Sequence, residues 1–264
     1  MNEKKGSALI TGASSGIGAL YADRLARQGY DLILVARSAD RLERVASAIR
    51  EATGAAVETI TADLGNTADL RRVEARLSND RSIDLLVNNA GIGSTARALD
   101  ADVDALSAMV ALNVEALMRL SQAAVPGFVA RGRGTIVNIA SIVAVAPELL
   151  NGVYGASKAF VLALSQSLHR ELEGTGVTVQ VVLPGATATG FWDVAGTPVE
   201  HLPGEIVMRA DAMVDAALAG LARGEFATIP GLHEEARWTA FEAARQAMAG
   251  ELSTSTPAAR YRAA

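Results

Sequence analysis

Apolar residues in this chain gather into short runs, separated by longer stretches with the periodicity of an amphipathic helix. The runs occupy residues 7–10, 32–36, 57–62, 83–87, 135–140, 177–183 and 226–229. Helical stretches fall between and after them, at 15–28, 41–53, 67–80, 101–131, 152–173, 210–223 and 234–250. The run at 32–36 is continuous, and such a run suits a strand that is buried on both faces, as in a parallel sheet.

This alternation of strand and helix predicts an α/β fold, a Rossmann-like doubly wound sheet of about seven parallel strands with helices on both faces. No linker or repeat interrupts it, so we expect a single domain over residues 1–264. The connection at 186–208 is rich in Gly and Pro and long enough for a substrate loop. At the C-terminus, residues 234–264 are expected to form a helix followed by a loose tail.

Composition narrows the classes of function. Half of the 264 residues are hydrophobic and the net charge is −5, which argues against a nucleic acid as the main partner. The chain has no cysteine, and its three histidines lack metal-ligand spacing, so we expect no metal site. No apolar run approaches about 18 residues, and residues 1–6 have a basic start without a long apolar segment behind it. We therefore expect a cytoplasmic protein that does not contact membranes.

A glycine-rich turn follows the first apolar run and begins the first helix. It comprises Gly12, Ser14, Ser15, Gly16, Ile17 and Gly18. Glycines let the backbone turn tightly, and the N–H groups and partial positive charge of a helix N-terminus attract phosphate. The turn is therefore predicted to bind the pyrophosphate of a dinucleotide, although its Gly-x-x-x-Gly-x-Gly spacing differs from the usual Gly-x-Gly-x-x-Gly.

The residues at the two ends of the second strand indicate which dinucleotide binds. An acid about 20 residues after the glycines often holds the ribose 2′-hydroxyl, and Asp31 has roughly that spacing. However, Asp31 precedes the run at 32–36, whereas ligands bind beyond the carboxyl ends of the strands. Arg37 stands at that end, and a guanidinium suits a 2′-phosphate. We therefore predict NADP(H) as the cofactor.

Candidate cofactor contacts follow the next two strands. They are Asp63 and Leu64 after the third strand, at the level of an adenine ring, and Asn89, Ala90 and Gly91 after the fourth. Asn88, just before them, could tie strand ends together or line the cofactor site. Asn113 interrupts an apolar helical stretch. Because a buried amide needs partners, a structural role in kinking the helix competes with a catalytic one.

Candidate proton-transfer residues lie on the helix at 152–173. Tyr154 and Lys158 are four residues apart and so project from one helical face. The lysine charge is expected to lower the pKa of the phenol toward the working range of a general acid or base. Ser141 follows the run at 135–140, and strand ends commonly present catalytic hydroxyls. The ordinary alternative for such a pair is a surface tyrosine and lysine on an amphipathic helix.

The substrate side of the chain looks apolar. Phe191 and Trp192, in the long connection, could close over an apolar substrate or pack the loop onto the protein. The residues at 142–151 are mostly apolar. No lysine or arginine falls in 186–206, which disfavours a phosphorylated or carrier-bound substrate.

Taken together, the motifs resemble those of the short-chain dehydrogenase/reductase (SDR) superfamily, in its single-domain branch. The resemblance covers about residues 6–230 and rests on Thr11-Gly12-x-x-x-Gly16-x-Gly18, Asp63, Asn88-Asn89-Ala90-Gly91, Asn113, Ser141, Tyr154-x-x-x-Lys158 and Pro184-Gly185, in the order of the family. Each motif is common alone, whereas their joint occurrence at the right strand ends is specific.

The resemblance implies a division of labour within the site. Tyr154 would exchange a proton with the substrate oxygen, Lys158 would lower its pKa and bind the nicotinamide ribose, and Ser141 would orient the carbonyl or alcohol. Asn113 would hold a water in a proton relay from Lys158. Further cofactor contacts are implied at Pro184, Gly185, Thr187 and Thr189, the last of them for the nicotinamide carboxamide. The family more often has an aliphatic residue at the position of Thr187.

We therefore expect an oxidoreductase that transfers a hydride between NADP(H) and a rather apolar carbonyl or secondary alcohol, with Tyr154 as general acid/base. Two alternatives stay open. One is a sensor or scaffold that binds NADP without turnover; the other is a nucleotide-sugar epimerase, against which the glycine spacing and the short C-terminal region argue. The resemblance also implies a homodimer or homotetramer that uses the helices at 101–131 and 152–173.

Overall fold

The computed structural model describes residues 5–262, and the chain divides into two compact units, one ending at Pro230 and one beginning at Gly231. We call residues 5–230 the body and residues 231–262 the arm, and we describe each by itself. The outermost residues of the expected 1–264 domain, with part of the basic N-terminal start, lie outside the described range. The single domain expected over 1–264 stays a prediction.

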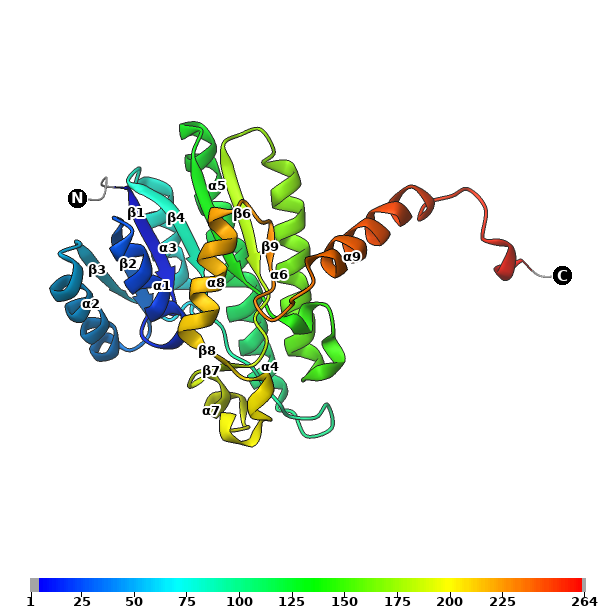
Figure 1. The fold of residues 1–264 in the computed structure, drawn as a ribbon, viewed down its shortest axis with the longest axis horizontal. Coiled ribbons are helices and arrows are strands. Elements are labelled where there is room, and N and C mark those ends of the chain that lie inside the picture. The colour runs from blue at the N-terminus through cyan, green and yellow to red at the C-terminus, as the bar shows by residue number, and fades with distance from the viewer. Residues whose placement is uncertain (1–4, 263–264) are drawn as a thin grey trace. The chain divides into compact units, whose positions relative to one another are not determined.

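A seven-stranded parallel sheet forms the centre of the body, in the order β3-β2-β1-β4-β5-β6-β9 (Figure 1). The strands are β1 (Ser7–Thr11), β2 (Asp31–Ala36), β3 (Val57–Thr61), β4 (Ile83–Asn88), β5 (Gly134–Ile139), β6 (Val177–Val182) and β9 (Ala227–Thr228). The chain reverses its direction of travel across the sheet between β1 and β4, which makes this pair the switch point where ligands bind. The Rossmann-like α/β fold is confirmed.

Helices cover both faces of the sheet. They are α1 (Gly16–Arg27), α2 (Ala39–Thr53), α3 (Thr67–Asn79), α4 (Val103–Val110), α5 (Leu117–Arg131), α6 (Gly152–Glu171) and α8 (Ala210–Ala222). Helices α1, α2 and α8 pack on one face, and α3, α5 and α6 pack on the other (Figure 1).

The central strand β1 shows why its sequence is an unbroken apolar run. Ala8 and Ile10 face the core shared with α1, α2 and α8, whereas Leu9 faces the core shared with α3 and α5. All three side chains are fully buried. Successive residues of a strand point to opposite faces, so a strand that is covered on both faces has no position that faces water.

The helix expected at 101–131 is divided in the structure. Helix α4 ends at Val110, a π-helical turn spans Ala111–Ala116, and α5 follows. Asn113 lies in that turn and bonds through its side chain to the backbone of Ile92. Asn113 therefore marks a distortion of the helix, which agrees with the structural role that was one of the two expected for it.

The connection expected to be a substrate loop contains short elements that the sequence did not predict. They are β7 (Thr187–Ala188), α7 (Phe191–Ala195) and β8 (Met208–Arg209), with β7 and β8 paired in a separate parallel sheet. We call residues 187–207 the lid. The lid is therefore folded onto itself and is not an extended loop.

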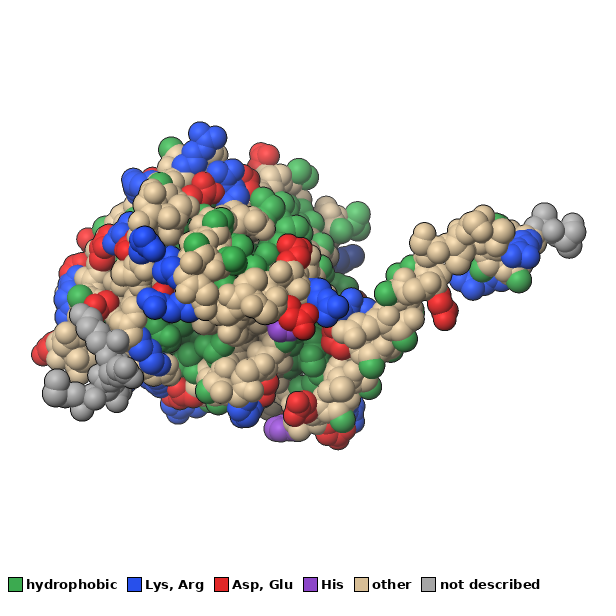
Figure 2. All heavy atoms as spheres, turned by 90° about the horizontal axis from the view of Figure 1, so that it is seen from above, with side chains coloured by type: hydrophobic (Ala, Val, Ile, Leu, Met, Phe, Trp, Pro, Cys, Tyr) green, Lys and Arg blue, Asp and Glu red, His purple; other side chains and the backbone are tan. Residues whose placement is uncertain are grey.

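The arm contains α9 (Glu235–Met248), none of whose residues is buried, and single helical turns at Ala249–Glu251 and Ala259–Tyr261. Within residues 5–262, no helix is both long and apolar enough to cross a membrane. On the face shown in Figure 2, acidic and basic side chains are interspersed, and several of the body's charges are paired, as Arg24 is with Asp215.

Candidate active site

The turn between β1 and α1 has a backbone that glycine adopts most readily. Gly12 and Gly16 have φ angles of +65° and +53°. A Cβ on Gly12 would lie 2.8 Å from Asn89 Nδ2, and one on Gly18 would collide with the carbonyl oxygen of Gly12. The turn is therefore packed tightly against the loop that follows β4, with no room for a side chain at Gly12 or Gly18.

The N-terminus of α1 suits an anionic ligand. Its N-cap residue, Ser15, forms no side-chain cap, and the first turn contains no acidic residue. Helix α3, in contrast, is capped by Asn66, whose side chain accepts from the N–H groups of Ala68 and Asp69. The first N–H groups of α1 thus have no side-chain acceptor, and the helix dipole favours negative charge beside them. These residues fit the dinucleotide pyrophosphate that the sequence predicts here.

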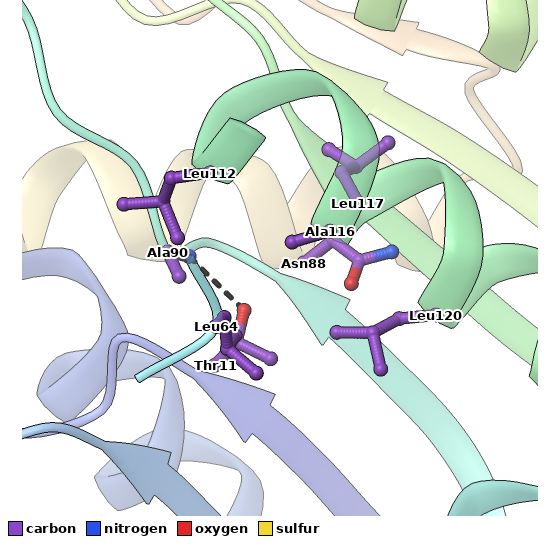
Figure 3. A pocket seen from close by; sticks show the side chains of 8 residues that line it. All are labelled: Thr11, Leu64, Asn88, Ala90, Leu112, Ala116, Leu117 and Leu120. Atoms are coloured by element: carbon purple, nitrogen blue, oxygen red, sulfur yellow. Dashed lines mark hydrogen bonds between the residues drawn. The ribbon is translucent and has the colours of Figure 1, made fainter. Parts of the chain in front are cut away.

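Thr11 and Asn89 join the ends of β1 and β4 at the switch point. Thr11 Oγ1 accepts hydrogen bonds of 3.0 Å from the N–H groups of Asn89 and Ala90, and Asn89 Nδ2 donates to the Thr11 carbonyl at 2.9 Å. Figure 3 shows the Thr11–Ala90 bond beside a small hollow that Leu64 and Leu112 also line. Asn89, predicted as a cofactor contact, therefore holds the glycine turn in place.

Asn88 has the structural role of the two that the sequence left open. Its Nδ2 donates to Asn138 Oδ1 on β5 and to Ser121 Oγ on α5, both at 3.0 Å. Its side chain also lines the hollow in Figure 3, and its Oδ1 is buried without a partner among the described residues. Asn88 thus ties two strands and a helix together beneath the ligand edge of the sheet.

The two ends of β2 carry the charges expected from the direction of the strand. Arg37 follows the carboxyl end, is exposed, and has no hydrogen bond or ion pair within residues 5–262. Asp31 lies at the other end, where it accepts a hydrogen bond from the Ala56 N–H at 3.1 Å. Asp63, after β3, is exposed and accepts from the Gly65 N–H at 3.0 Å. The cation, and not the acid, therefore lies at the ligand edge of β2.

Tyr154 and Lys158 lie side by side on α6, and both are buried. Lys158 Nζ is 5.8 Å from the centroid of the Tyr154 ring and donates to the Ile139 carbonyl, at the end of β5, over 2.9 Å. Burial lowers the pKa of Lys158 from 10.5 to about 8, because the interior disfavours the ammonium.

The expected lowering of the tyrosine pKa is wrong for this structure. Burial raises the pKa of Tyr154 to about 12, and the interaction with the Ser141 side chain opposes this only partly. The sequence gives the spacing of Tyr154 and Lys158 along a helix, but not how deeply they are buried, and desolvation of the phenolate dominates. At neutral pH Tyr154 is therefore a protonated phenol, able to donate a proton.

Ser141 joins the tyrosine to the segment after β6. It is buried, its side chain interacts with the Tyr154 phenol and lowers the pKa of that group, and it precedes a helical turn at Ile142–Ala144. Its Oγ lies 3.4 Å from both the Pro184 carbonyl oxygen and the Val143 nitrogen. Both distances are long for hydrogen bonds, so the hydroxyl is only weakly held by the backbone.

Asn113 uses its side chain to hold the loop after β4. Oδ1 accepts from the Ile92 N–H at 2.9 Å, and Nδ2 donates to the Ile92 carbonyl at 2.8 Å and to Ser157 Oγ at 3.2 Å. Gly91 lies between Asn113 and Lys158, since a Cβ there would be 3.1 Å from Asn113 Oδ1 and 3.6 Å from Lys158 Nζ. The proton relay implied for Asn113 stays a prediction.

The segment after β6 reaches the glycine turn. A Cβ on Gly16 would lie 3.3 Å from Cγ2 of Thr189, so Thr189 stands beside the expected pyrophosphate position. Thr187 is buried, and its Oγ1 donates to the Gly185 carbonyl at 3.0 Å. The Thr187 side chain thus packs the segment itself, and its expected contact with the cofactor stays a prediction.

Trp192 has the packing role of the two that the sequence left open, whereas closure of Phe191 over a substrate stays a prediction. Trp192 is buried and donates through Nε1 to the Thr187 carbonyl at 3.0 Å, so it packs the lid. The Phe191 ring lies 5.7 Å from the Tyr154 ring, centroid to centroid, and covers Gly93, where a Cβ would collide with it. Apolar side chains complete this cluster, namely Ile92, Leu106, Met109, Ile142, Val143, Leu150 and Val153.

Sequence reasoning missed polar residues that hold these parts together. Thr95 bonds to Ala195 in the lid, and Asn151 caps α6 and bonds to Ala96. The cap had a visible signal, since asparagine just before a helical stretch is a common N-cap. The bonds to Ala195 and Ala96 had none, because each joins distant parts of the chain.

Lys158→Met is expected to stabilise the protein below about pH 8 and to lose this advantage by about pH 10.5. Below pH 8 the native state must bury an ammonium that the unfolded chain keeps in water. Between these values only the unfolded chain stays protonated, so the wild type gains stability as the pH rises. The full difference is about 3 kcal/mol, at 1.36 kcal/mol per pKa unit, less the lost bond to Ile139.

Urea unfolding of both proteins from about pH 6 to pH 10 measures this difference in the free energy of unfolding. Lys5→Met, at an exposed lysine, is the control and is expected to show no such pH dependence. Parallel stability curves for the wild type and Lys158→Met would contradict the burial of a titrating lysine.

Comparison with known proteins agrees with this geometry. The profile of the family described as short chain dehydrogenase matches residues 6–198. The very-long-chain 3-oxoacyl-CoA reductase of Anas platyrhynchos is 35% identical over 208 residues, which are 77% of this chain and 66% of that protein. The chain therefore matches just under two thirds of the length of this relative.

Two solved structures match nearly the whole chain. A short-chain dehydrogenase from Sphingobium yanoikuyae, in complex with NADPH, is 48% identical with a TM-score of 0.94, covering 97% of this chain and 100% of that one. The bulky-bulky ketone specific alcohol dehydrogenase from Comamonas testosteroni is 44% identical with a TM-score of 0.90, covering 98% and 99%. With the glycine turn and the Tyr154–Lys158 pair in the places described, the chain belongs to the short-chain dehydrogenase family and is an oxidoreductase.

Proposed function

We propose that this protein reduces large, mostly apolar ketones with NADPH and oxidises the corresponding secondary alcohols with NADP⁺. The observation that carries the proposal is the setting of the Tyr154 phenol, which is buried in an apolar cluster, protonated at neutral pH and near enough to the Ser141 side chain for the two to interact. A carbonyl oxygen at that hydroxyl would meet a proton donor within walls that exclude water.

The residues would act as follows. The cofactor, when bound, supplies or accepts the hydride. Tyr154 gives its phenolic proton to the carbonyl oxygen as negative charge develops there, and the Ser141 hydroxyl orients that oxygen by a hydrogen bond. The nearby ammonium of Lys158 stabilises the phenolate that Tyr154 becomes. In the reverse direction the phenolate accepts the proton of the alcohol.

Arg37 supports NADP(H) over NAD(H). It places an exposed guanidinium, without a partner among the described residues, at the ligand edge of β2. The 2′-phosphate is the group that distinguishes the two cofactors, and a guanidinium binds phosphate through charge-assisted hydrogen bonds. The Sphingobium relative, at 48% identity, is in complex with NADPH.

The apolar cluster around Tyr154 supports a bulky ketone as substrate, the class named for the Comamonas relative. The relative from Anas platyrhynchos is named for a 3-oxoacyl-CoA, and the coenzyme A part of such a substrate bears phosphate groups. In this chain no lysine or arginine falls in 186–206, and Arg209 after the lid is ion-paired with Asp211 at 2.5 Å. A substrate without phosphate therefore fits the lid better.

We also propose a homo-oligomer in the cytoplasm. In the arm, Phe241 and Met248 on α9 and Leu252 after it have 42%, 53% and 76% of their surfaces exposed. A second copy of the chain that covered these apolar side chains would remove them from water and stabilise the arm. Light scattering on the purified chain tests this, and the mass of a single chain would contradict it.

Arg37→Asp is expected to raise the KM for NADPH by about 10- to 100-fold, because a charge-assisted bond to phosphate is lost and a carboxylate replaces it. The KM for NADH should stay the same or fall. Steady-state kinetics with both cofactors measure the ratio. Arg44→Asp, at an exposed arginine of α2, makes the same charge change as a control. An unchanged preference in Arg37→Asp would rule out this role.

Tyr154→Phe is expected to lower turnover by about 10²- to 10⁴-fold while NADPH still binds, because the general acid is removed. NADPH oxidation with aryl alkyl ketones of increasing size measures turnover, with a 3-oxoacyl-CoA as the competing substrate class. Tyr21→Phe is the control, since the Tyr21 hydroxyl is buried and has no partner within residues 5–262.

Three outcomes would count against the proposal. Substantial turnover by Tyr154→Phe would reject Tyr154 as the acid. Turnover of the 3-oxoacyl-CoA, without turnover of any ketone in the series, would reject bulky ketones as the substrate class. Tight NADPH binding by the wild type without turnover of any carbonyl would favour a cofactor-binding sensor.

A further inference from the structure

The short loop at residues 92–96, which we call the bridging loop, is tied to three different elements. At its start, Ile92 is held by Asn113 through both of its backbone groups. Near its end, Thr95 bonds to Ala195 of α7, and the next residue, Ala96, accepts a hydrogen bond from Asn151. The bridging loop therefore touches the π-helical turn, the lid and the start of the helix that carries Tyr154.

Asn151 does more than cap α6. It is buried, and its Oδ1 accepts from the N–H groups of Val153 and Tyr154 at 2.9 and 3.3 Å. This acceptor alone is what an N-cap needs. Its Nδ2 in addition donates to the Ala96 carbonyl at 2.6 Å. One side chain thus bonds to the backbone of Tyr154 and to the bridging loop.

The other side of the bridging loop holds the lid. The Thr95 N–H and Oγ1 both donate to the Ala195 carbonyl, at 2.9 and 3.0 Å, and Thr95 Oγ1 lies 3.0 Å from Thr197 Oγ1. Phe191, in the same lid helix, covers Gly93 and lies 5.7 Å from the Tyr154 ring. The lid therefore contacts both the bridging loop and the Tyr154 ring, and Asn151 bonds to both the bridging loop and the Tyr154 backbone.

We propose that Asn151 is a positioning residue that couples the placement of Tyr154 to the closure of the lid over the substrate. This inference rests on the proposed function, in which Tyr154 donates the proton. Proton transfer depends steeply on the distance and angle between donor and acceptor. A bond from Asn151 to Ala96 fixes the start of α6 relative to the lid that forms the facing wall, so the phenol meets a substrate carbonyl in one defined geometry.

Two variants separate this role from helix capping. Asn151→Ser keeps an oxygen for the cap, but its side chain is too short to reach Ala96. Asn151→Asp also keeps the cap and has no N–H to donate. Both are expected to retain NADPH affinity, to lower the thermal midpoint by no more than a few degrees because one hydrogen bond is lost, and to lower kcat for ketone reduction about tenfold or more while KM changes less. Serine is itself a good N-cap residue, so a loss of turnover in Asn151→Ser would not be caused by the loss of the cap.

The matched control is Asn66→Ser. Asn66 caps α3 with the same pair of bonds, at 2.9 and 3.2 Å, and lies outside the site. The Asn66→Ser variant is expected to have kcat and KM values within about twofold of the wild type. Kinetic constants of Asn151→Ser and Asn151→Asp within that same range would overturn the proposal. So would a thermal midpoint that falls in parallel with kcat, because that marks a structural role alone.

Amide hydrogen exchange gives a readout that does not depend on turnover. In Asn151→Ser, amides of the bridging loop and of residues 191–197 are expected to exchange faster than in the wild type, whereas those in the middle of α6 are unchanged. Unchanged exchange in the lid overturns the coupling. A wild type that reduces no ketone defeats the proposed function instead, and the exchange experiment still decides on Asn151.

Discussion

The burial of the Lys158 ammonium is the constraint on which the site depends. Its Nζ donates to the Ile139 carbonyl at the end of β5, and this contact requires the first turns of α6 to lie directly over the ligand edge of the sheet. Tyr154, one turn earlier, is carried to the same depth. The low dielectric that lowers the pKa of Lys158 also raises that of Tyr154, so burial sets the protonation state of both groups.

The remaining parts of the site are joined to this pair through the ends of β1 and β4. Thr11 and Asn89 lock the glycine turn to the loop after β4. The same loop continues past Gly91 to the bridging loop, which Asn113 and Asn151 hold. A single stretch of chain thus runs from the expected phosphate position, past the lysine, to the lid. Polar side chains bonded to backbone groups fix it at each step.

The features best predicted from the sequence are those that depend on the burial of a strand on both faces or on the direction of the chain. Short, mostly apolar runs located the strands of the seven-stranded sheet, and the direction of β2 placed Arg37 at the ligand edge. The pKa of Tyr154 could not be predicted, because residue spacing gives no depth. Strands β7 and β8 have two residues each, too few for a pattern. The bond from Asn151 to Ala96 joins residues 55 positions apart and becomes visible only in the fold.

The protonation state of Tyr154 is the claim that can be measured most directly. Carbon-13 NMR of tyrosines labelled at Cζ, in the protein without added cofactor, follows each phenol through a pH titration, and the spectrum of Tyr154→Phe assigns the signal. Burial predicts that Tyr154 stays a neutral phenol to at least pH 10, the usual midpoint of an exposed tyrosine. A midpoint at or below about pH 8 would show that the charge of Lys158, and not burial, governs the tyrosine.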